Sequence, residues 1–517
     1  MLTTFKRNFE YYSYAKKQAQ KYYAKKQYNK SIEWIQIAAT IAWTNNFGVY
    51  VDLELEELIA KIGIEANIQG RKKEIKSDAT STELSILHVM TEAYLVGGHT
   101  KLVDNMMKST FSIHSLIILN QSKDEEVPEW LKSTVESRNG HFEILDKDDN
   151  YLLKAEHLRK KVLNDFDVVV LHTHPNDPIP ILAFSGGIDS LVITVNHADH
   201  VFWLGSSITN LCLEITKSGQ NISKRYRGIR NSELMRIPLS ENISKYSCDK
   251  KKRFREQYKI PRNATVLLCI ASSYKFTPFQ EFDFKGIFTE VLRQNKNTHL
   301  VIVGPSNKEL YWKYIPNELK GRVHIVGMQK DIEAYYGLAN VYIESFPFGS
   351  HTSCLGAMIR GIPVFPAPKP VLPELVLDEY KSVENASVSK EDYISNLLKF
   401  LNDTERLKEK GMRQKKEVTD LHCNPNWGKH IEFIIKENLK VKENQDINLG
   451  DLSGIEKRNF NENLPLIITG IQDPIIIILS KVRLKYKLSF LYLAFQTMKS
   501  RKASTQLLKK IYKIFKK

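Results

Sequence analysis

The sequence has few cysteines, and their spacing suggests neither a metal site nor a disulfide framework. Five cysteines are scattered through the 517 residues, namely Cys212, Cys248, Cys269, Cys354 and Cys423. None of them forms a close pair with the spacing of zinc ligands, and isolated thiols of this kind are usually buried and reduced. We therefore expect no metal site and a reducing, cytosolic environment.

Long apolar runs are also missing. The N-terminal residues MLTTFKRNFEYYSYAKK contain no apolar core of the kind that a secretory signal has. The chain has no uncharged apolar run of about 18 residues, so we expect no spanning helix. Hydrophobic residues nevertheless make up 42% of the chain, which is enough to build sizeable cores and excludes disorder along its whole length. The sequence thus predicts a folded, cytoplasmic protein.

Acidic residues are absent from the tail, where much of the excess positive charge lies. The net charge is +16, and Pro474 to Lys517 contribute twelve Lys or Arg residues and no Asp or Glu. We find no nucleic-acid-binding module, so we expect no nucleic-acid partner. The segment from residue 507 to 517 fits a basic amphipathic helix, which could bind an anionic surface on the inner face of the membrane. A solvated helix, or one packed on the rest of the protein, would explain the pattern equally well.

Apolar periodicity divides the remaining chain into one helical region and two regions in which strands alternate with helices. From residue 5 to about 75, apolar residues recur at helical spacing with few Gly or Pro. Alternation begins at Leu84 and resumes after a polar, basic stretch from Lys217 to Arg262. The predicted strands are 85–90, 114–119, 168–171 and 191–195, then 265–271, 299–304, 323–327, 341–344 and 362–365. Such alternation predicts parallel sheets of the doubly wound kind.

The expected fold class is therefore α/β, with two Rossmann-like domains. We place a helical N-terminal region at 1–78, one Rossmann-like domain at 79–240, a second at 241–440 and a basic, partly helical tail at 441–517. Ligands of open parallel sheets bind at the carboxyl ends of the strands. Two such sheets facing a common cleft would hold a donor on one wall and an acceptor on the other.

The most informative segment lies near the end of the second domain. A strand ends near Glu344, a loop follows, and a helix closed by Gly361 begins with the small polar residues Ser350, His351, Thr352 and Ser353. The N–H groups and the dipole at the start of a helix form an anion site, for which a diphosphate is a natural ligand. Lys275, after the first strand of the same domain, could reach the same phosphates as a point charge. An ordinary capped helix and a solvated lysine are the alternatives.

These motifs resemble a known family of sugar-transferring enzymes. Gly-Ser-His-Thr-Ser at 349–353, followed by Gly-Ile-Pro-Val at 361–364, is similar to the donor loop of the O-GlcNAc transferase family and its bacterial protein-glycosylating relatives. Segments 86–100 and 195–205 are similar to bacterial GT-B glycosyltransferases, and the resemblance spans roughly residues 80 to 435. It implies a GT-B enzyme that transfers a sugar from a nucleotide-sugar, here expected to be a UDP-sugar, to a protein, glycan or lipid.

The resemblance also implies which residues hold the donor. Lys275 and the turn formed by His351, Thr352 and Ser353 match the family's diphosphate contacts, and Ser350 and Glu344, which precede the turn, complete the predicted donor site.

Two departures from known families affect the predicted reaction. Gly356 stands where the O-GlcNAc transferase loop has an acidic ribose ligand, and the Glu-x7-Glu pair of many retaining enzymes is absent because position 352 is Thr. We expect an inverting hexosyl or N-acetylhexosaminyl transfer without a metal or other cofactor.

An inverting transfer needs a base, for which histidine is suited near neutral pH. Five histidines at predicted strand ends could serve, although each could also be structural: His99, His172, His174, His197 and His200. We predict His99 and His174 as the catalytic pair. Gly97 and Gly98, which precede His99, form the predicted acceptor-side loop, because glycines allow close approach of a substrate. No acidic or thiol cluster joins the histidines, which argues against a metal site.

One motif favours a different class of enzyme. Ser185-Gly186-Gly187-Ile188-Asp189-Ser190 matches the phosphate loop of the ATP pyrophosphatase family, which adenylates its substrates. Such a loop should lead from a strand into a helix, whereas Leu191-Val-Ile-Thr-Val is β-branched and strand-like. A turn between a short helix and a strand explains the two glycines equally well, so we predict a structural role for this loop.

Overall fold

The structure is a computed structural model that describes residues 2–443 except 46, 69–82, 96–97, 123–125, 241–247, 277, 279–280, 330, 369–378, 384–386 and 388. The predicted basic tail lies outside the described residues. The chain divides into two compact units, of which the second comprises Arg236–Trp427 and the first comprises Met1–Met235 with the segment that begins at Gly428. Of the described helices, none has the length and apolar character needed to cross a membrane.

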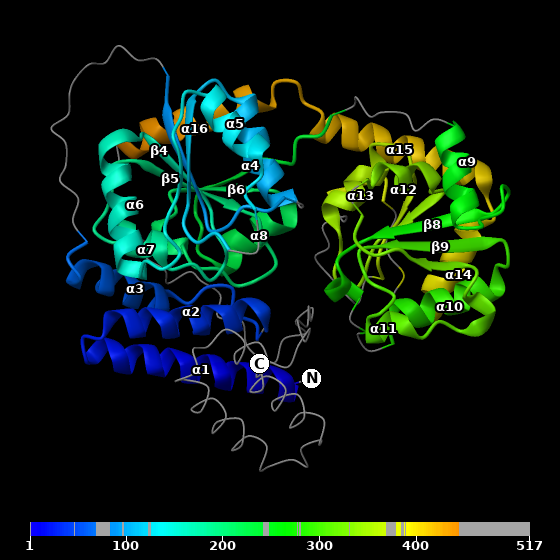
Figure 1. Ribbon diagram of the computed structural model, residues 1–517, viewed down its shortest axis with the longest axis horizontal. Coiled ribbons are helices and arrows are strands. Elements are labelled where there is room, and N and C mark those ends of the chain that lie inside the picture. The colour runs from blue at the N-terminus through cyan, green and yellow to red at the C-terminus, as the bar shows by residue number, and fades with distance from the viewer. Residues whose placement is uncertain are drawn as a thin grey trace. The chain divides into compact units, whose positions relative to one another are not determined.

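The N-terminal region is helical, as the periodicity predicts, and packs within the first unit. It consists of α1 (Leu2–Ala24), α2 (Tyr28–Thr44) and α3 (Leu53–Glu65), which Figure 1 shows in blue below α7. Asp52 caps α3 by accepting a hydrogen bond from the Leu55 amide, and its carboxylate also binds the Lys16 ammonium at 2.6 Å. One half-buried aspartate therefore fixes both the start of α3 and its position against α1.

The first unit contains a seven-stranded parallel sheet with the strand order β3-β2-β1-β4-β5-β6-β7. Its central strands are almost entirely buried, which explains their apolar runs. The strands are β1 (Ser85–Met90), β2 (Ile113–Ile118), β3 (Phe142–Ile144), β4 (Val168–His172), β5 (Leu191–Asn196), β6 (Leu211–Glu214) and β7 (Ser232–Leu234). The helices between them are α4 (Gly98–Ser109), α5 (Glu129–Ser137), α6 (Tyr151–Asp165), α7 (Ile179–Phe184) and α8 (Lys217–Tyr226), with the 3₁₀ turn η1 at Ser206–Ile208.

Two segments differ from the sequence-based division. The stretch Lys217 to Arg262 reads as a polar separator, yet it supplies α8 and β7 to the first sheet and α9 (Cys248–Gln257) to the second unit. The last described helix, α16 (Trp427–Glu443), returns to the first unit, where Lys442 donates to the carbonyl of Ile188 and to that of Ser190. The Phe111 amide also donates to Glu432, and Asn231 donates to Asn438. Sequence patterns do not reveal this return, because it depends on contacts between residues far apart in the chain.

The second unit contains a five-stranded parallel sheet with the order β10-β9-β8-β11-β12. Its apolar strands pack against helices in a core that includes Tyr335, Tyr342 and Met358. The strands are β8 (Thr265–Ile270), β9 (Thr298–Val303), β10 (Val323–Ile325), β11 (Val341–Ile343) and β12 (Val364–Phe365). The other elements are η2 (Ser273–Phe276), α10 (Phe284–Gln294), α11 (Leu310–Lys313), η3 (Asn317–Leu319), α12 (Glu333–Leu338), α13 (His351–Met358), α14 (Lys390–Leu401) and α15 (Thr404–His422). Two parallel sheets with intervening helices confirm the predicted α/β class.

Candidate functional site

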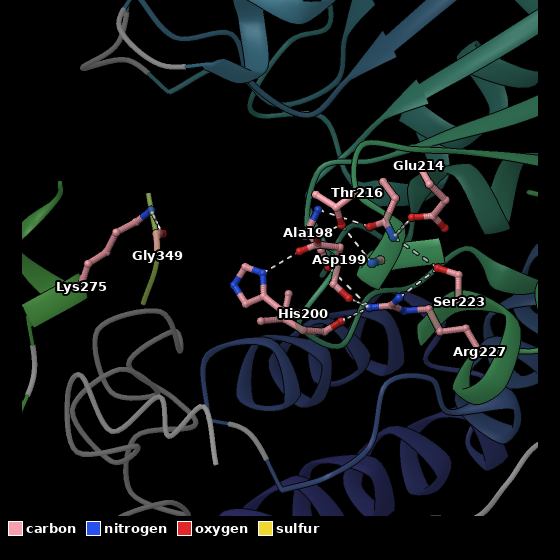
Figure 2. Close-up of polar contacts among 12 residues, drawn as sticks. Ala198, Asp199, His200, Glu214, Thr216, Ser223, Arg227, Lys275 and Gly349 are labelled. Carbon is pink, nitrogen blue, oxygen red and sulfur yellow. Dashed lines mark hydrogen bonds and ion pairs between the residues drawn. The ribbon is translucent and has the colours of Figure 1, made fainter. Parts of the chain in front are cut away.

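The second unit brings together Lys275 and the loop after β11. Lys275 lies in η2, directly after β8, and β8 pairs with β11 in the sheet. The Lys275 ammonium donates to the Gly349 carbonyl at 2.7 Å, as Figure 2 shows, and the Phe348 amide donates to the Lys275 carbonyl at 3.4 Å. The predicted lysine therefore lies at the carboxyl edge of the sheet and contacts the predicted donor loop.

The helix that follows this loop begins where the sequence predicts. Ser350 is the N-cap residue of α13, but no side chain of the described residues caps the helix, because the Ser350 hydroxyl lies 3.1 Å from the Ser345 hydroxyl instead. The first amides of a helix have no partner within the helix. At the other end, Gly361 has φ +71°, which allows the turn into β12. The N-terminus of α13 thus has the properties of an anion site.

His351, Thr352 and Ser353 occupy the first turn of α13. The His351 ring donates from Nε2 to the Tyr380 hydroxyl at 3.2 Å, because Tyr380 in turn donates to Nε2 of His422 at 2.8 Å. His422 donates from Nδ1 to the Ile237 carbonyl, and burial lowers the pKa of His422 to about 4, so it is neutral at pH 7. This series of hydrogen bonds orients the His351 ring. The sequence motifs did not indicate Tyr380 or His422. Thr352 is exposed, whereas Ser353 is half-buried.

Two other residues of the loop have structural surroundings. Glu344 is fully buried at the end of β11 and accepts a hydrogen bond from the Ala367 amide at 2.9 Å, which ties the ends of β11 and β12 together. Through this contact, Glu344 stabilises the backbone from which the predicted donor loop begins. A Cβ at Gly356 would lie 2.5 Å from the hydroxyl of Tyr336, which donates to the Ser353 carbonyl. Packing against Tyr336 therefore explains why a glycine stands at this position.

The first unit gathers four of the five candidate histidines at the carboxyl edge of its sheet. His99 lies in the first turn of α4 and donates from Nε2 to the His172 carbonyl at 3.0 Å. Its Nδ1 is buried and has no hydrogen-bond partner among the described residues. Burial lowers the pKa of His99 to about 4, so the ring is neutral near pH 7 and Nδ1 carries a lone pair. An acceptor nitrogen in this state has the properties of a general base.

His174 lies close to His99. Its ring stacks on Tyr94 at a centroid distance of 6.0 Å, and its Nε2 lies 3.0 Å from the Tyr94 hydroxyl. Tyr94 donates to the Glu92 carboxylate at 2.6 Å, so His174 donates to Tyr94 from Nε2. The ring centroids of His99 and His174 are 6.4 Å apart. His200 is exposed, and its Nδ1 lies 2.8 Å from the Asp199 carboxylate. Gly98 begins α4, and Gly97 lies outside the described residues.

The structure adds two histidines that the sequence motifs did not indicate. His88 on β1 and His114 on β2 are buried and join His172 and His197 in one hydrogen-bonded series. Burial holds the pKa of His88 and that of His172 well below the usual value, and it lowers the pKa of His114 to about 3. All are therefore neutral at pH 7. In sequence, His88 and His114 read only as single polar residues within apolar strands.

A buried arginine holds the loop that follows β5. Arg227, which follows the last residue of α8, donates to the carbonyls of Asp199 and Val201, at 2.7 and 2.6 Å. Figure 2 shows the contact with Asp199. Arg227 also donates to the Ser223 hydroxyl, and Asn196 links that hydroxyl to the buried Glu214 carboxylate. This network fixes the backbone directly after His197.

The glycine loop at 185–190 has the structure of a turn. It connects α7 to β5, as predicted, and Gly187 has φ +76°. Its carbonyls are already occupied, since Arg159 donates to the Gly187 carbonyl at 3.0 Å and Lys442 donates to the Ile188 carbonyl at 3.3 Å. The loop also lies before β5 and hence at the amino edge of the sheet, opposite the edge where ligands bind. The predicted turn between a short helix and a strand is therefore present, and its structural role stays a prediction.

We accordingly expect Asp189→Asn to have little effect on catalysis. Asp189 lies in this turn, away from the carboxyl edge, so sugar transfer should stay within a few fold of the wild-type rate. ATP should not raise the melting temperature of the protein. ATP-dependent stabilisation that Asp189→Asn abolishes would instead favour an adenylating enzyme.

Comparisons with known proteins agree with this geometry. Residues 266–403 match the family model described as glycosyl transferases group 1, a range that includes Lys275 and all of α13. No curated protein matches the sequence.

Several solved structures have a similar fold. A glycosyltransferase from Rickettsia africae has a TM-score of 0.54 at 15% identity, covering 70% of this chain and 100% of that one. Anabaena HepE in complex with UDP and glucose has a TM-score of 0.51 at 12% identity, covering 69% of this chain and 100% of that one. The Thermobaculum terrenum O-GlcNAc transferase has a TM-score of 0.51 at 11% identity, covering 80% of this chain and 78% of that one. At these identities the similarity shows the fold.

Proposed function

We propose that this chain, a GT-B glycosyltransferase by its fold and its glycosyl transferases group 1 domain, transfers a hexosyl or N-acetylhexosaminyl group from a UDP-sugar to a hydroxyl-bearing acceptor. The family match and the two parallel sheets support the predicted GT-B fold and the predicted glycosyltransferase class, whereas the hexosyl or N-acetylhexosaminyl specificity stays a proposal. The nature of the donor is supported by Anabaena HepE, whose solved complexes contain UDP, UDP-glucose and glucose. A common cleft between the two units stays a prediction.

The contact of Lys275 with the donor loop carries the proposal. A nucleoside diphosphate would place its phosphates against the uncapped N-terminus of α13, beside the Lys275 ammonium. Both groups stabilise negative charge, which grows on the diphosphate as the bond to the sugar breaks. The donor site therefore both binds the nucleotide and stabilises the leaving group, and the proposal includes no metal.

The transfer itself is a single displacement. The acceptor oxygen bonds to the anomeric carbon while the bond from that carbon to the diphosphate oxygen breaks, and UDP leaves. The hydroxyl proton goes to a base, for which we propose His99, whose Nδ1 is unprotonated and unpartnered among the described residues. His174, which stacks on Tyr94 at the same edge, would orient the acceptor rather than take its proton.

A polar cavity supports a hydroxyl-rich acceptor. It has a volume of about 220 Å³ and is bounded partly by Thr91, Asn120 and Asp177, which follow β1, β2 and β4. The Lys154 ammonium donates to the Leu119 carbonyl beside it. Amide, carboxylate and hydroxyl groups of this kind bind sugar hydroxyls, so a glycan is the acceptor class that we propose to test first.

UDP release from a panel of UDP-glucose, UDP-galactose and UDP-N-acetylglucosamine tests the proposal. We expect one of these sugars to give UDP, with or without a glycan acceptor, and ATP to give no pyrophosphate. If the nucleotide-sugars bind but none is turned over, the chain is a binding protein with this fold and the proposal fails.

Lys275→Ala should weaken use of the donor far more than it weakens folding. Loss of a charged hydrogen bond to phosphate costs on the order of 1.5–3 kcal/mol in binding or in transition-state stabilisation. We expect kcat/KM for the UDP-sugar to fall about 10- to 150-fold, as follows from that range.

Lys285→Ala is the matched control, because the Lys285 ammonium also binds a backbone carbonyl of the same unit, that of Tyr311, at 2.6 Å. This control should keep its donor affinity. Wild-type turnover by Lys275→Ala would contradict the proposed donor site.

A further inference from the structure

Three histidines on neighbouring strands and one directly after β5 form a continuous hydrogen-bonded row across the first sheet. The spacings are 2.9 Å from His114 to His88, 3.0 Å from His88 to His172, and 3.0 Å from His172 to His197. His114 lies opposite Ile86, two residues before His88, and His88 lies opposite Val170, two residues before His172. Residues two apart share a face of a strand, so the row crosses one face diagonally and ends at the carboxyl edge.

The buried end of the row sets its direction. The Thr110 hydroxyl donates its only hydrogen to the Met106 carbonyl at 2.8 Å. Toward Nε2 of His114, 2.7 Å away, the hydroxyl oxygen can therefore only accept, so Nε2 of His114 is the donor. A neutral imidazole has one N–H, which makes Nδ1 of His114 an acceptor for His88. The same rule then applies at each step: His88 donates from Nε2 to His114, and His172 donates from Nε2 to His88.

The same rule determines which nitrogen of His197, the last ring of the row, carries the proton. His197 donates from Nε2 to Nδ1 of His172, so its own Nδ1 carries a lone pair and no proton. The ring lies beside His99, at a centroid distance of 4.3 Å. The row has no exit for a proton at its far end, because the Thr110 hydroxyl is bound to a helix carbonyl. It therefore fixes tautomers and does not conduct protons through the sheet.

We infer that the row of His114, His88 and His172, ended by Thr110, positions His197 as an obligate hydrogen-bond acceptor for the substrate hydroxyl beside His99. The inference rests on the proposed function, which places the acceptor hydroxyl at this edge. His197 contacts the substrate, whereas the other three histidines and Thr110 are positioning residues. One nitrogen accepts a hydrogen bond that orients the hydroxyl, and the neighbouring base, His99, removes the proton.

Thr110→Val tests the inference at the end of the row remote from the substrate. Valine keeps the shape of threonine but leaves Nε2–H of His114 without an acceptor, which is costly for a buried donor. Reversal of every tautomer in the row relieves that cost and puts the proton of His197 on Nδ1. Imidazole ¹⁵N shifts of protein labelled in its 14 histidines report each tautomer directly, with resonances assigned from single-histidine variants.

We expect Nδ1 of His197 to be unprotonated in the wild type and protonated in Thr110→Val. In the same variant, kcat for UDP release should fall at least tenfold while the KM for the UDP-sugar stays unchanged. Thr110→Ser should restore both the tautomers and the rate. Thr134→Val is the control for loss of a buried hydroxyl, because the Thr134 hydroxyl donates to the Asp104 carboxylate at 2.7 Å, lies 2.9 Å from the Trp130 carbonyl four residues earlier, and does not contact the row.

Two results would overturn the inference. A proton on Nδ1 of His197 in the wild type contradicts the row itself, and this reading does not depend on the folding of Thr110→Val. Reversed tautomers in Thr110→Val with an undiminished kcat contradict the role of His197. Failure of the wild-type protein to release UDP from any sugar would instead contradict the proposed function, and the tautomer readings would still decide whether the row exists.

Discussion

His99→Ala should lower the rate of sugar transfer about a hundredfold or more, which is the usual scale for a lost general base. The wild-type side chain presents a buried Nδ1 whose lone pair has no partner among the described residues, because Nε2 donates to the His172 carbonyl. Donor affinity should change little, since Lys275 and α13 belong to the other unit. Steady-state kinetics with varied UDP-sugar separates the two effects, with kcat lowered and KM retained.

The pH dependence of the wild-type rate gives a second reading of the same residue. The pKa of His99 is lowered to about 4, mainly by burial, so protonation should remove the base only below about pH 5. The rate should therefore stay constant from pH 7 down to about pH 5.

His157→Ala is the matched control for His99→Ala, because His157 pairs with Glu143 on an exposed surface of the same unit. If this control loses as much activity as His99→Ala, the assignment of the base is wrong.

The arrangement of the predicted donor residues could largely be predicted from the sequence. Lys275 and the small polar residues of the turn each follow a recognisable apolar strand, and the carboxyl ends of parallel strands share one edge. The contact of Lys275 with Gly349 additionally requires β8 and β11 to be neighbours, although 74 residues separate the paired positions. Strand order is set by long-range packing, which local residue patterns do not encode. For the same reason, the sequence could not predict the contact of Glu344 with the Ala367 amide or the contact of His351 with Tyr380.

The histidine row shows more clearly why local sequence patterns do not predict contacts between residues on different strands. His88 and His114 each stand alone within an apolar strand, where a single polar residue gives no signal of function. Only the register of β2, β1, β4 and β5 brings them into a line with His172 and His197. Arg227 was overlooked for a related reason. It lies in a basic stretch that reads as a separator, yet it is completely buried.

Arg227→Met should destabilise the first unit by about 3–5 kcal/mol, the range for removing one partner of a buried charged pair. The Arg227 guanidinium donates to the carbonyls of Asp199 and Val201. Burial lowers its pKa, and the charge of the buried Glu214 carboxylate, which Asn196 and Ser223 link to Arg227, opposes that shift. Methionine fills similar space but leaves those carbonyls without a donor and Glu214 without a countercharge. Urea unfolding followed by tryptophan fluorescence measures the loss, because the Trp203 ring lies 5.1 Å from the guanidinium.

Two further variants identify the cause of that loss. Arg225→Met removes an exposed arginine from the same helix and should change the free energy of unfolding by no more than about 0.5 kcal/mol. Glu214→Gln added to Arg227→Met should recover part of the stability, because it removes the unpaired buried charge. If the double variant is no more stable than Arg227→Met, the carbonyls after β5 account for the effect. If Arg227→Met costs no more than Arg225→Met, the network does not hold the loop beside His197.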